Sequence, residues 1–171
     1  MQTDSLKTKL PSAKAYLICG SICSGKTYYA RQLSAAKNAV ILSCDEIEND
    51  LFQKSLGEAH DAMAEHIHKY LLKKAVEIIH HGTNVILDWG FWRKSDRENT
   101  SSYFKSLNIS YEWHYMDTSP QQRSKNINSR NQAVINGESS DYYVDGDLLQ
   151  KCSAFFQPPC REEIDVWHES K

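Results

Sequence analysis

The chain has 171 residues, of which 40% are hydrophobic, and this content is sufficient for one domain with a sizeable core. Its formal net charge of −2 lacks the basic excess that polynucleotide binding usually requires, which disfavours a long nucleic acid as partner. The 5 cysteines, an odd number without a CxxC pair, indicate neither a disulfide framework nor a zinc site, and favour reduced thiols in a cytoplasm.

The segment before the first predicted strand is polar. Residues Met1 to Lys14 carry scattered lysines rather than the apolar stretch of a signal peptide, and no apolar run approaches membrane-spanning length. We therefore expect a single cytoplasmic domain over residues 1–171, with a loose arm at residues 1–14 and no membrane partner. We expect a monomer or a dimer.

The first predicted strand, Ala15 to Cys19, leads directly into a phosphate-binding loop. The residues that follow match the pattern G-x-x-x-x-G-K-[ST] at every fixed position: Gly20-Ser21-Ile22-Cys23-Ser24-Gly25-Lys26-Thr27. Behind the loop, Tyr29, Leu33 and Ala36 recur at the spacing of one helix face. Strand, glycine loop and helix are the context that the pattern requires, so the sequence predicts a nucleotide site for ATP and Mg²⁺.

The residue types of this loop suit an anion. Gly20 and Gly25 tolerate backbone conformations that side chains forbid, and the N–H groups of the loop point into one concavity at the positive end of a helix. Lys26 supplies a charge for the β- and γ-phosphates, and the Thr27 hydroxyl can ligate Mg²⁺. Cys23 is either a thiol made reactive by the positive field or a small filler residue.

The second predicted strand, Ala39 to Ser43, is followed by an acid. Asp45 is a candidate general base for an acceptor hydroxyl, and the alternative is that it caps a helix ahead of Glu46. From Ile47 to Leu56 the hydrophobic pattern weakens. We expect an irregular segment there that contributes to acceptor specificity.

A long helix and a third strand come next. The helix from Glu58 to His81 is apolar on one side, and its His66 and His68 lie two residues apart, so they form a poor pair of metal ligands. The strand from Asn84 to Asp88 closes on an acid. Asp88 suits a residue that holds Mg²⁺ directly or through water.

Aromatic residues follow the third strand. Trp89, Phe91 and Trp92, together with Tyr142 and Tyr143 from a later segment, are candidates for the walls of an acceptor pocket. The alternative is that they are core residues, which is the commoner role of aromatic side chains.

The next predicted elements are a helix from Arg93 to Leu107 and a fourth strand from Ser110 to Met116. Asp117 follows this strand, and it either joins the acids of the site or has a capping or turn role beside Ser119-Pro120. Ser119 and Pro120 cap and begin a further helix, which we expect to end near Ile135.

This last helix carries two arginines on one face. Arg123 and Arg130 lie seven residues apart and either close over the triphosphate or remain solvated. The polar segment Asn136 to Asp141 predicts a mobile loop. A short helix from Gly146 to Phe156 and a last strand from Asp165 to His168 complete the chain.

Strands that alternate with helices at this spacing predict one α/β domain, with a parallel sheet covered on both faces. Ligands of such sheets bind beyond the carboxyl ends of the strands. We therefore expect Asp45, Asp88 and Asp117 to lie at the same edge as the phosphate loop.

Motifs along the whole chain resemble one family. They are the phosphate loop with Leu42-Ser43-Cys44-Asp45, Ile86-Leu87-Asp88-Trp89-Gly90-Phe91-Trp92 with Arg97, Asp117 with Ser129-Arg130-Asn131, and Val144-Asp145-Gly146-Asp147-Leu148-Leu149 with Phe156-Gln157-Pro158-Pro159. Together they resemble the AAA-type small P-loop kinases, which are similar to phage polynucleotide kinase, chloramphenicol phosphotransferase and zeta toxin. The resemblance extends from about Ala15 to Glu163.

This resemblance implies a three-layer P-loop NTPase fold, with a five-stranded parallel sheet of order 2-3-1-4-5 and a small helical lid. It implies ATP with Mg²⁺ as donor, Asp45 in contact with the acceptor hydroxyl, and Arg130 as the lid arginine. By the same resemblance, Trp89, Trp92 and Arg97 belong to the acceptor side.

Two positions depart from the family pattern. Glu48 stands where polynucleotide kinases carry an arginine, which argues against the gripping of a phosphorylated end. Asn126 stands where many members carry an arginine four residues before the lid arginine, and Arg123 can take its place one turn earlier.

The function that these features favour is transfer of the γ-phosphoryl group of ATP to a hydroxyl of a small molecule. A 5′-hydroxyl nucleic-acid kinase or nucleotide-sugar kinase is an alternative on the same fold. An ATP-dependent switch or adaptor that transfers no phosphate is the alternative from another class.

Overall fold

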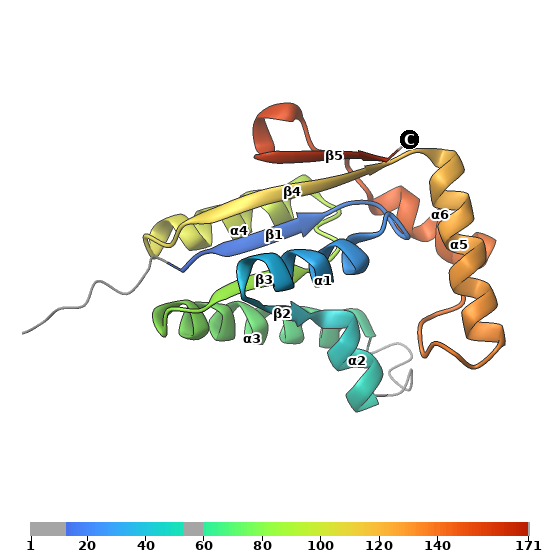
Figure 1. Cartoon of the computed structure of the whole chain (residues 1–171), viewed down its shortest axis with the longest axis horizontal. Coiled ribbons are helices and arrows are strands. Elements are labelled where there is room, and N and C mark those ends of the chain that lie inside the picture. The colour runs from blue at the N-terminus through green and yellow to red at the C-terminus, as the bar shows by residue number, and fades with distance from the viewer. Residues whose placement is uncertain (1–12, 53–59, 171) are drawn as a thin grey trace, which may run out of the picture.

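A computed structural model of the protein describes residues 13–52 and 60–170 (Figure 1). Its elements in chain order are β1 (Ala15–Cys19), α1 (Lys26–Lys37), β2 (Ala39–Ser43), α2 (Cys44–Phe52), α3 (His60–His80), β3 (Asn84–Asp88), α4 (Lys94–Ser106), β4 (Tyr111–Thr118), α5 (Pro120–Ile135), α6 (Gly146–Phe155), the 3₁₀ helix η2 (Arg161–Glu163) and β5 (Val166–Ser170). The five strands form one parallel sheet of order β2-β3-β1-β4-β5, which confirms the predicted α/β class and strand order.

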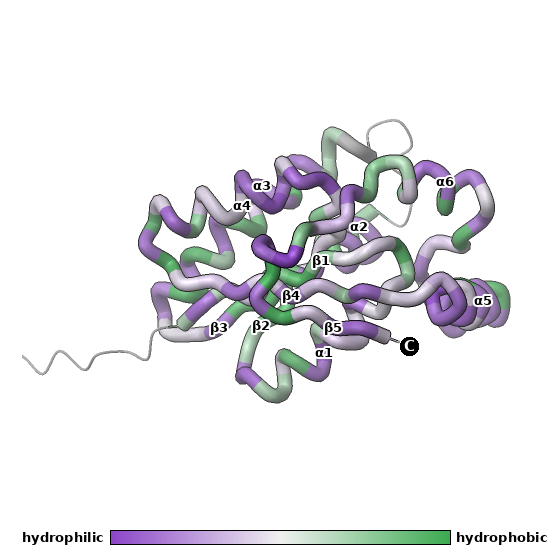
Figure 2. Tube along the Cα trace, turned by 90° about the horizontal axis from the view of Figure 1, so that it is seen from above, coloured by the Kyte–Doolittle hydropathy of each residue, from purple (hydrophilic) through white to green (hydrophobic). Residues whose placement is uncertain are grey.

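The sheet is covered on both faces because its central strands are apolar on both sides. Along β1, Leu17 and Cys19 face the core shared with α3 and α4, whereas Tyr16 and Ile18 face α1. Figure 2 shows α3 and α4 above the sheet and α1 below it. The three layers therefore follow from the alternation of side chains along buried strands.

Helices α5 and α6 lie apart from these layers, at the edge toward which the strands point (Figure 1). None of residues 120–135, which the structure describes in full, has a buried side chain, and Figure 2 shows most of α5 as hydrophilic. Ser119 accepts a hydrogen bond from the backbone N–H of Gln122 and Pro120 occupies the first turn, so the predicted cap is confirmed. We call residues 120–155 the lid.

Several element boundaries differ from the predictions, and two of these differences bear on the site. The segment expected to be irregular from Ile47 is helical, because α2 runs from Cys44 to Phe52; residues 53–56 of that segment lie outside the described ones. The fourth strand continues past Met116 to Thr118, because β5 pairs with it as far as Ser170. Asp117 therefore lies inside β4 rather than behind it.

The ends of the expected domain are partly described. Residues 1–12 of the predicted arm lie outside the described part, and Lys14 is tied to the fold: its N–H donates to Asn84 Oδ1 at 3.0 Å and its ammonium pairs with Glu112. All 5 cysteines are free thiols, as predicted. Within residues 13–52 and 60–170, no helix has the length and apolar character needed to cross a bilayer.

A polar network is buried between α1 and the outer strands of the sheet. His114, which is 3% exposed, has its Nδ1 2.8 Å from the Tyr29 hydroxyl and its Nε2 2.9 Å from Glu112 Oε1. The ring of His168 stacks on that of His114 with the centroids 5.6 Å apart. Burial lowers the pKa of both imidazoles, although Glu112 opposes this shift at His114.

We expect the free energy of unfolding to fall as the pH drops below about 6.5, the ordinary pKa of histidine. Below this pH the two histidines are protonated in the unfolded chain, whereas their lowered pKa values keep them neutral in the folded protein. Protonation therefore favours unfolding. Urea unfolding at pH 7.5 and pH 5.5 measures the loss. His114→Gln should lose less stability between these pH values than wild type, and His80→Gln, at an exposed imidazole, should lose as much. Equal losses for wild type and His114→Gln would contradict this account.

Candidate active site

The phosphate loop connects β1 to α1 with the geometry that its glycines predict. Gly25 has φ 90° and precedes the first turn of α1, a conformation that side chains rarely adopt. A Cβ on Gly20 would lie 2.5 Å from Ser24 Oγ, so the loop closes tightly at this point. Thr118 Oγ1 donates to the Ser24 carbonyl at 2.8 Å and fixes the loop against the end of β4.

Lys26 lies at the start of α1 and is held by the loop itself. Its ammonium donates to the carbonyls of Gly20 at 3.1 Å and Ser21 at 2.7 Å. Loss of solvent lowers the pKa of Lys26, and the negative charges of Asp88 and Asp45 oppose this shift. The lysine and both carboxylates therefore share one electrostatic environment, as expected for the carboxyl edge of a parallel sheet.

The structure brings the two predicted metal ligands together. The Thr27 hydroxyl hydrogen-bonds to the carboxylate of Asp88, which is 6% exposed at the end of β3. Burial raises the pKa of Asp88, and the bond from Thr27 and the charge of Lys26 oppose this rise. Within residues 13–52 and 60–170, no three His, Cys, Asp or Glu side chains gather as a metal site.

Asp45 lies in the first turn of α2 with its side chain exposed. The backbone N–H of Glu46 donates to Ser43 Oγ at 3.3 Å, so Ser43 rather than Asp45 caps this helix. Ser43 is also the register partner of Asp88 across β2 and β3. Asp45 is thus placed next to the phosphate loop and remains available as a base.

Two further side chains, His68 and Tyr142, lie near Asp45. The ring of His68 is tilted against the indole of Trp89, with the centroids 4.6 Å apart, and this indole donates to the Leu42 carbonyl at 3.2 Å. Burial lowers the pKa of His68, against the opposing charge of Asp45. Burial and the nearby carboxylates of Glu48 and Asp45 raise the pKa of Tyr142.

Arg130 extends from α5 toward the phosphate loop. Its Nη1 lies 3.9 Å from Cys23 Sγ, and its Nε donates to the Tyr142 carbonyl at 3.1 Å. Asn126, where the resemblance implies an arginine, donates through Nδ2 to the Cys23 carbonyl at 2.9 Å. Asn126 thus fastens the lid to Cys23, whose φ of 56° is unusual for a residue with a side chain.

Arg123 and Asp117 occupy different surroundings from Arg130. The charge of Arg123 acts on Tyr115, a residue of β4 that packs against Trp167. Asp117 accepts a hydrogen bond from Trp167 Nε1 at 3.0 Å, so its carboxylate ties β4 to β5. The capping role considered for Asp117 belongs to Ser119.

The expected contact between Arg97 and the acceptor is not what the structure shows. Arg97 is 2% exposed, and its Nε pairs with Glu163 Oε2 at 2.8 Å. Burial raises the pKa of Glu163, but the bonds from Arg97 and from the Cys160 backbone outweigh this and lower it to about 2. The guanidinium is thus part of an internal ion pair. The two residues are 66 positions apart in the sequence, so no local pattern predicts their pairing.

The aromatic residues divide between the core and the surface. Trp89 and Phe91, each 6% exposed, stack on one another in the larger core, with centroids 5.2 Å apart. Trp92 is half-buried, and Tyr143 is 50% exposed. Trp92, Tyr142 and Tyr143 therefore keep exposed surface and remain candidate acceptor walls, whereas Trp89 and Phe91 are mainly core residues.

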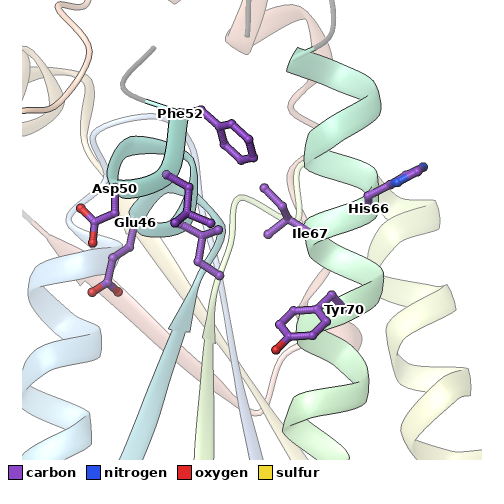
Figure 3. Close-up of a pocket in the computed structure, with 8 residues that line it drawn as sticks. Glu46, Asp50, Phe52, His66, Ile67 and Tyr70 are labelled. Carbon is purple, nitrogen blue, oxygen red and sulfur yellow. The ribbon is translucent and has the colours of Figure 1, made fainter. Parts of the chain in front are cut away.

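A separate groove lies between α2 and α3 (Figure 3). It measures about 540 Å³ and has a mainly apolar lining, part of which comes from the segment after Ile47 that was expected to contribute to acceptor specificity. The lining residues are Glu46, Ile47, Asp50, Leu51, Phe52, His66, Ile67 and Tyr70. Ile67 and Tyr70 point toward it, and His66 points away (Figure 3).

His68 is the residue of the site that sequence reasoning missed. A signal was present, since His68 lies among the apolar positions Ile67, Leu71 and Leu72 of α3, and a polar side chain on an apolar face often has a specific partner. The helical start of α2 also had a signal, because Ser43-Cys44-Asp45-Glu46 matches the capping-box pattern.

Residues 16–159 match a family model described as an AAA domain, and no curated protein sequence matches the chain. Among solved structures, the chain is similar to the APS kinase CysC of Mycobacterium tuberculosis in complex with AMPPNP and APS (18% identity, 93% of this chain and 89% of that chain, TM-score 0.67). It is also similar to a gluconokinase from Sinorhizobium meliloti (13%, 93% and 83%, TM-score 0.62). Kti12 of Chaetomium thermophilum in complex with ADP-AlF3 is a third (15%, 91% and 88%, TM-score 0.65). The chain therefore has the fold of P-loop kinases.

Proposed function

Since the chain belongs to the AAA-domain family and has a P-loop kinase fold, we propose that it transfers the γ-phosphoryl group of ATP to a hydroxyl of a small molecule. The observation that carries this proposal is the convergence at one sheet edge of Lys26, the bonded pair Thr27 and Asp88, and the exposed carboxylate of Asp45. A nucleotide-binding loop alone would need no base beside it.

The phosphate loop binds the donor. Its N–H groups and the N-terminus of α1 hold the phosphates, and Lys26 exchanges its loop carbonyls for β- and γ-phosphate oxygens. Thr27 and Asp88 would hold Mg²⁺, whose remaining ligands come from phosphate oxygens and water. When bound, this ion supplies charge neutralisation at the phosphates.

The acceptor lies on the side of Asp45, His68 and Tyr142. Asp45 accepts the proton of the attacking hydroxyl as the O–P bond forms and the bond between the γ-phosphorus and the bridging oxygen breaks, leaving ADP. Arg130 approaches from the lid and stabilises the charge that develops on the transferred group. A small-molecule acceptor is favoured over a nucleic acid by Glu48, which is 3% exposed one turn after Asp45 on α2.

A transfer screen with radiolabelled ATP against nucleosides, sugars, aminoglycosides and oligonucleotides tests the proposal. Label in a small-molecule product supports it, and label in oligonucleotides alone would favour the nucleic-acid kinase. Hydrolysis of ATP without any labelled product would favour the switch, a function in which the chain binds ATP and transfers nothing.

Lys26→Ala is the control for this screen, and we expect it to abolish transfer. It removes a charged partner of the phosphates, which typically contributes about 1.5–3 kcal/mol, so ATP affinity should fall roughly tenfold to a hundredfold. The fold should persist, because the lysine bonds only to loop carbonyls. Calorimetry measures the ATP affinity and thermal unfolding checks the fold; undiminished binding and turnover would remove the phosphate-site assignment.

A further inference from the structure

The loop between β3 and α4, residues 89–93, has an unusual backbone. Phe91 has φ 44°, in the left-handed region that bulky residues rarely occupy. A Cβ on Gly90 would lie 2.4 Å from Trp92 Nε1, so the indole of Trp92 folds back onto Gly90. Such a conformation persists only where neighbouring groups hold it.

Gln157 bonds both to this loop and to residues of α4 that follow it. Its N–H donates to the Trp92 carbonyl at 2.7 Å, and its side-chain Oε1 accepts from the Lys94 N–H at 2.8 Å. Its carbonyl accepts from Arg97 Nη1 at 3.0 Å, and the same nitrogen donates to the Phe91 carbonyl at 3.1 Å. One residue thus fixes the loop, the first turn of α4 and the buried guanidinium together.

Gln157 also lies just after the C-terminal end of the lid. Helix α6 ends at Phe155, and the Arg93 guanidinium lies over the Phe155 ring, 5.0 Å from its centroid. Phe156 stacks on Tyr115 of β4 with the centroids 6.4 Å apart. A movement of α6 is therefore transmitted first to Gln157 and to the loop that it holds.

The other end of the lid rests on the phosphate loop through polar contacts. Asn126 donates to the Cys23 carbonyl and Arg130 lies 3.9 Å from Cys23 Sγ, whereas residues 120–135, all described, bury no side chain. Polar contacts of this kind open at low cost compared with a packed core. The lid thus connects the phosphate loop, at Cys23, with the β3–α4 loop, at Trp92.

We propose that Gln157 is a positioning residue that couples the lid to the β3–α4 loop, so that nucleotide binding at the phosphate loop sets the shape of the acceptor side. The inference rests on the proposed function in one respect, namely that the phosphate loop binds a nucleotide. When Arg130 moves from the Tyr142 carbonyl to the phosphates, α5 and α6 shift and Gln157 carries Trp92 with them. The coupling runs through the lid rather than through the sheet.

The test uses the full chain labelled with 5-fluorotryptophan. Its 4 tryptophans give separate ¹⁹F resonances, and Trp92→Phe identifies that of Trp92. Adding AMPPNP with Mg²⁺ should shift the Trp92 resonance in wild type. Gln157→Ala keeps the backbone bonds of residue 157 to Trp92 and Arg97 and removes only the side-chain acceptor of the Lys94 N–H. Residue 157 is then held less firmly to the start of α4, and the response should fall by about threefold or more.

Two variants control this experiment. Gln157→Glu keeps an acceptor for Lys94 and should restore the response, and Gln150→Ala makes the same truncation at an exposed position of α6 and should leave it unchanged. Calorimetry follows AMPPNP affinity in every variant. We expect this affinity to stay within about threefold of wild type, because none of the hydrogen bonds of Gln157 to the described residues reaches the phosphate loop.

The outcomes separate this inference from the proposed function. Binding of AMPPNP with an unmoved Trp92 resonance, or an undiminished response in Gln157→Ala, would overturn the coupling and leave the kinase proposal intact. Absence of AMPPNP binding would overturn both. With an acceptor in hand, Gln157→Ala should raise its KM by about threefold to tenfold and leave the KM for ATP unchanged.

Discussion

Arg130→Ala should lower the rate of phosphoryl transfer by about 10³–10⁵, the range that a charge-stabilising arginine contributes in this chemistry. Its guanidinium already lies over the phosphate loop, 3.9 Å from Cys23 Sγ. Because such an arginine acts mainly in the transition state, the loss should appear in kcat far more than in ATP affinity. Steady-state transfer and calorimetric ATP binding measure the two effects separately.

Two substitutions sharpen this expectation. Arg130→Lys should not restore the rate, because an ammonium lacks the planar fork that spans two phosphate oxygens. Arg123→Ala should cost much less, because the charge of Arg123 acts on Tyr115 rather than on the phosphate loop. Equal rates in all three variants would show that this face of α5 is only solvated, and would favour the switch.

Asp45→Asn should lower the transfer rate by about 10²–10⁴, the usual effect of losing a general base. The amide has the size of the carboxylate but cannot accept the hydroxyl proton. ATP affinity should stay within about threefold, because Asp45 lies on the acceptor side of Lys26 and acts on it only through its charge. Single-turnover transfer with a saturating acceptor is the measurement.

Asp50→Asn is the matched control on the same helix. Asp50 lies further along α2, and Figure 3 shows its carboxylate on the side of this helix that points away from α3. The substitution removes an equal charge from the same helix at a position not predicted to belong to the site, and the rate should be that of wild type. If the transfer rate of Asp45→Asn is within a few fold of that of wild type, the general base is another residue. Asp45 then contributes only the electrostatic effect of its negative charge.

Most of the fold could be predicted from the sequence, because β1, β2 and β3 are short, mainly apolar runs next to turn signals. Ala15 to Cys19 and Asn84 to Asp88 have their predicted bounds, since both are buried on two faces and need no distant partner to be recognised. The end of β4 could not be predicted in this way. Its last residues, Asp117 and Thr118, are polar and become strand only by pairing with β5.

The candidate site was predictable where motif and topology act together. The pairing of Ser43 with Asp88 follows from the strand order, and that order brings Thr27 to Asp88 and leaves Asp45 beside them. Residues whose roles depend on a partner far along the chain were not predictable. The sequence around Arg97 gives no sign that its side chain is buried. Burial of this arginine depends on its ion pair with Glu163.

The ion pair of Arg97 with Glu163 also has a consequence for synthesis on the ribosome. All residues of the phosphate loop and of β3 are translated well before Glu163, and until then the Arg97 guanidinium has no counter-charge in the core. Burial of an unpaired charge is costly, so the region around Phe91 cannot close at that stage. Domains generally fold as units. The core around Arg97 can therefore close only after Glu163 has been synthesised, when nearly the whole chain has been made.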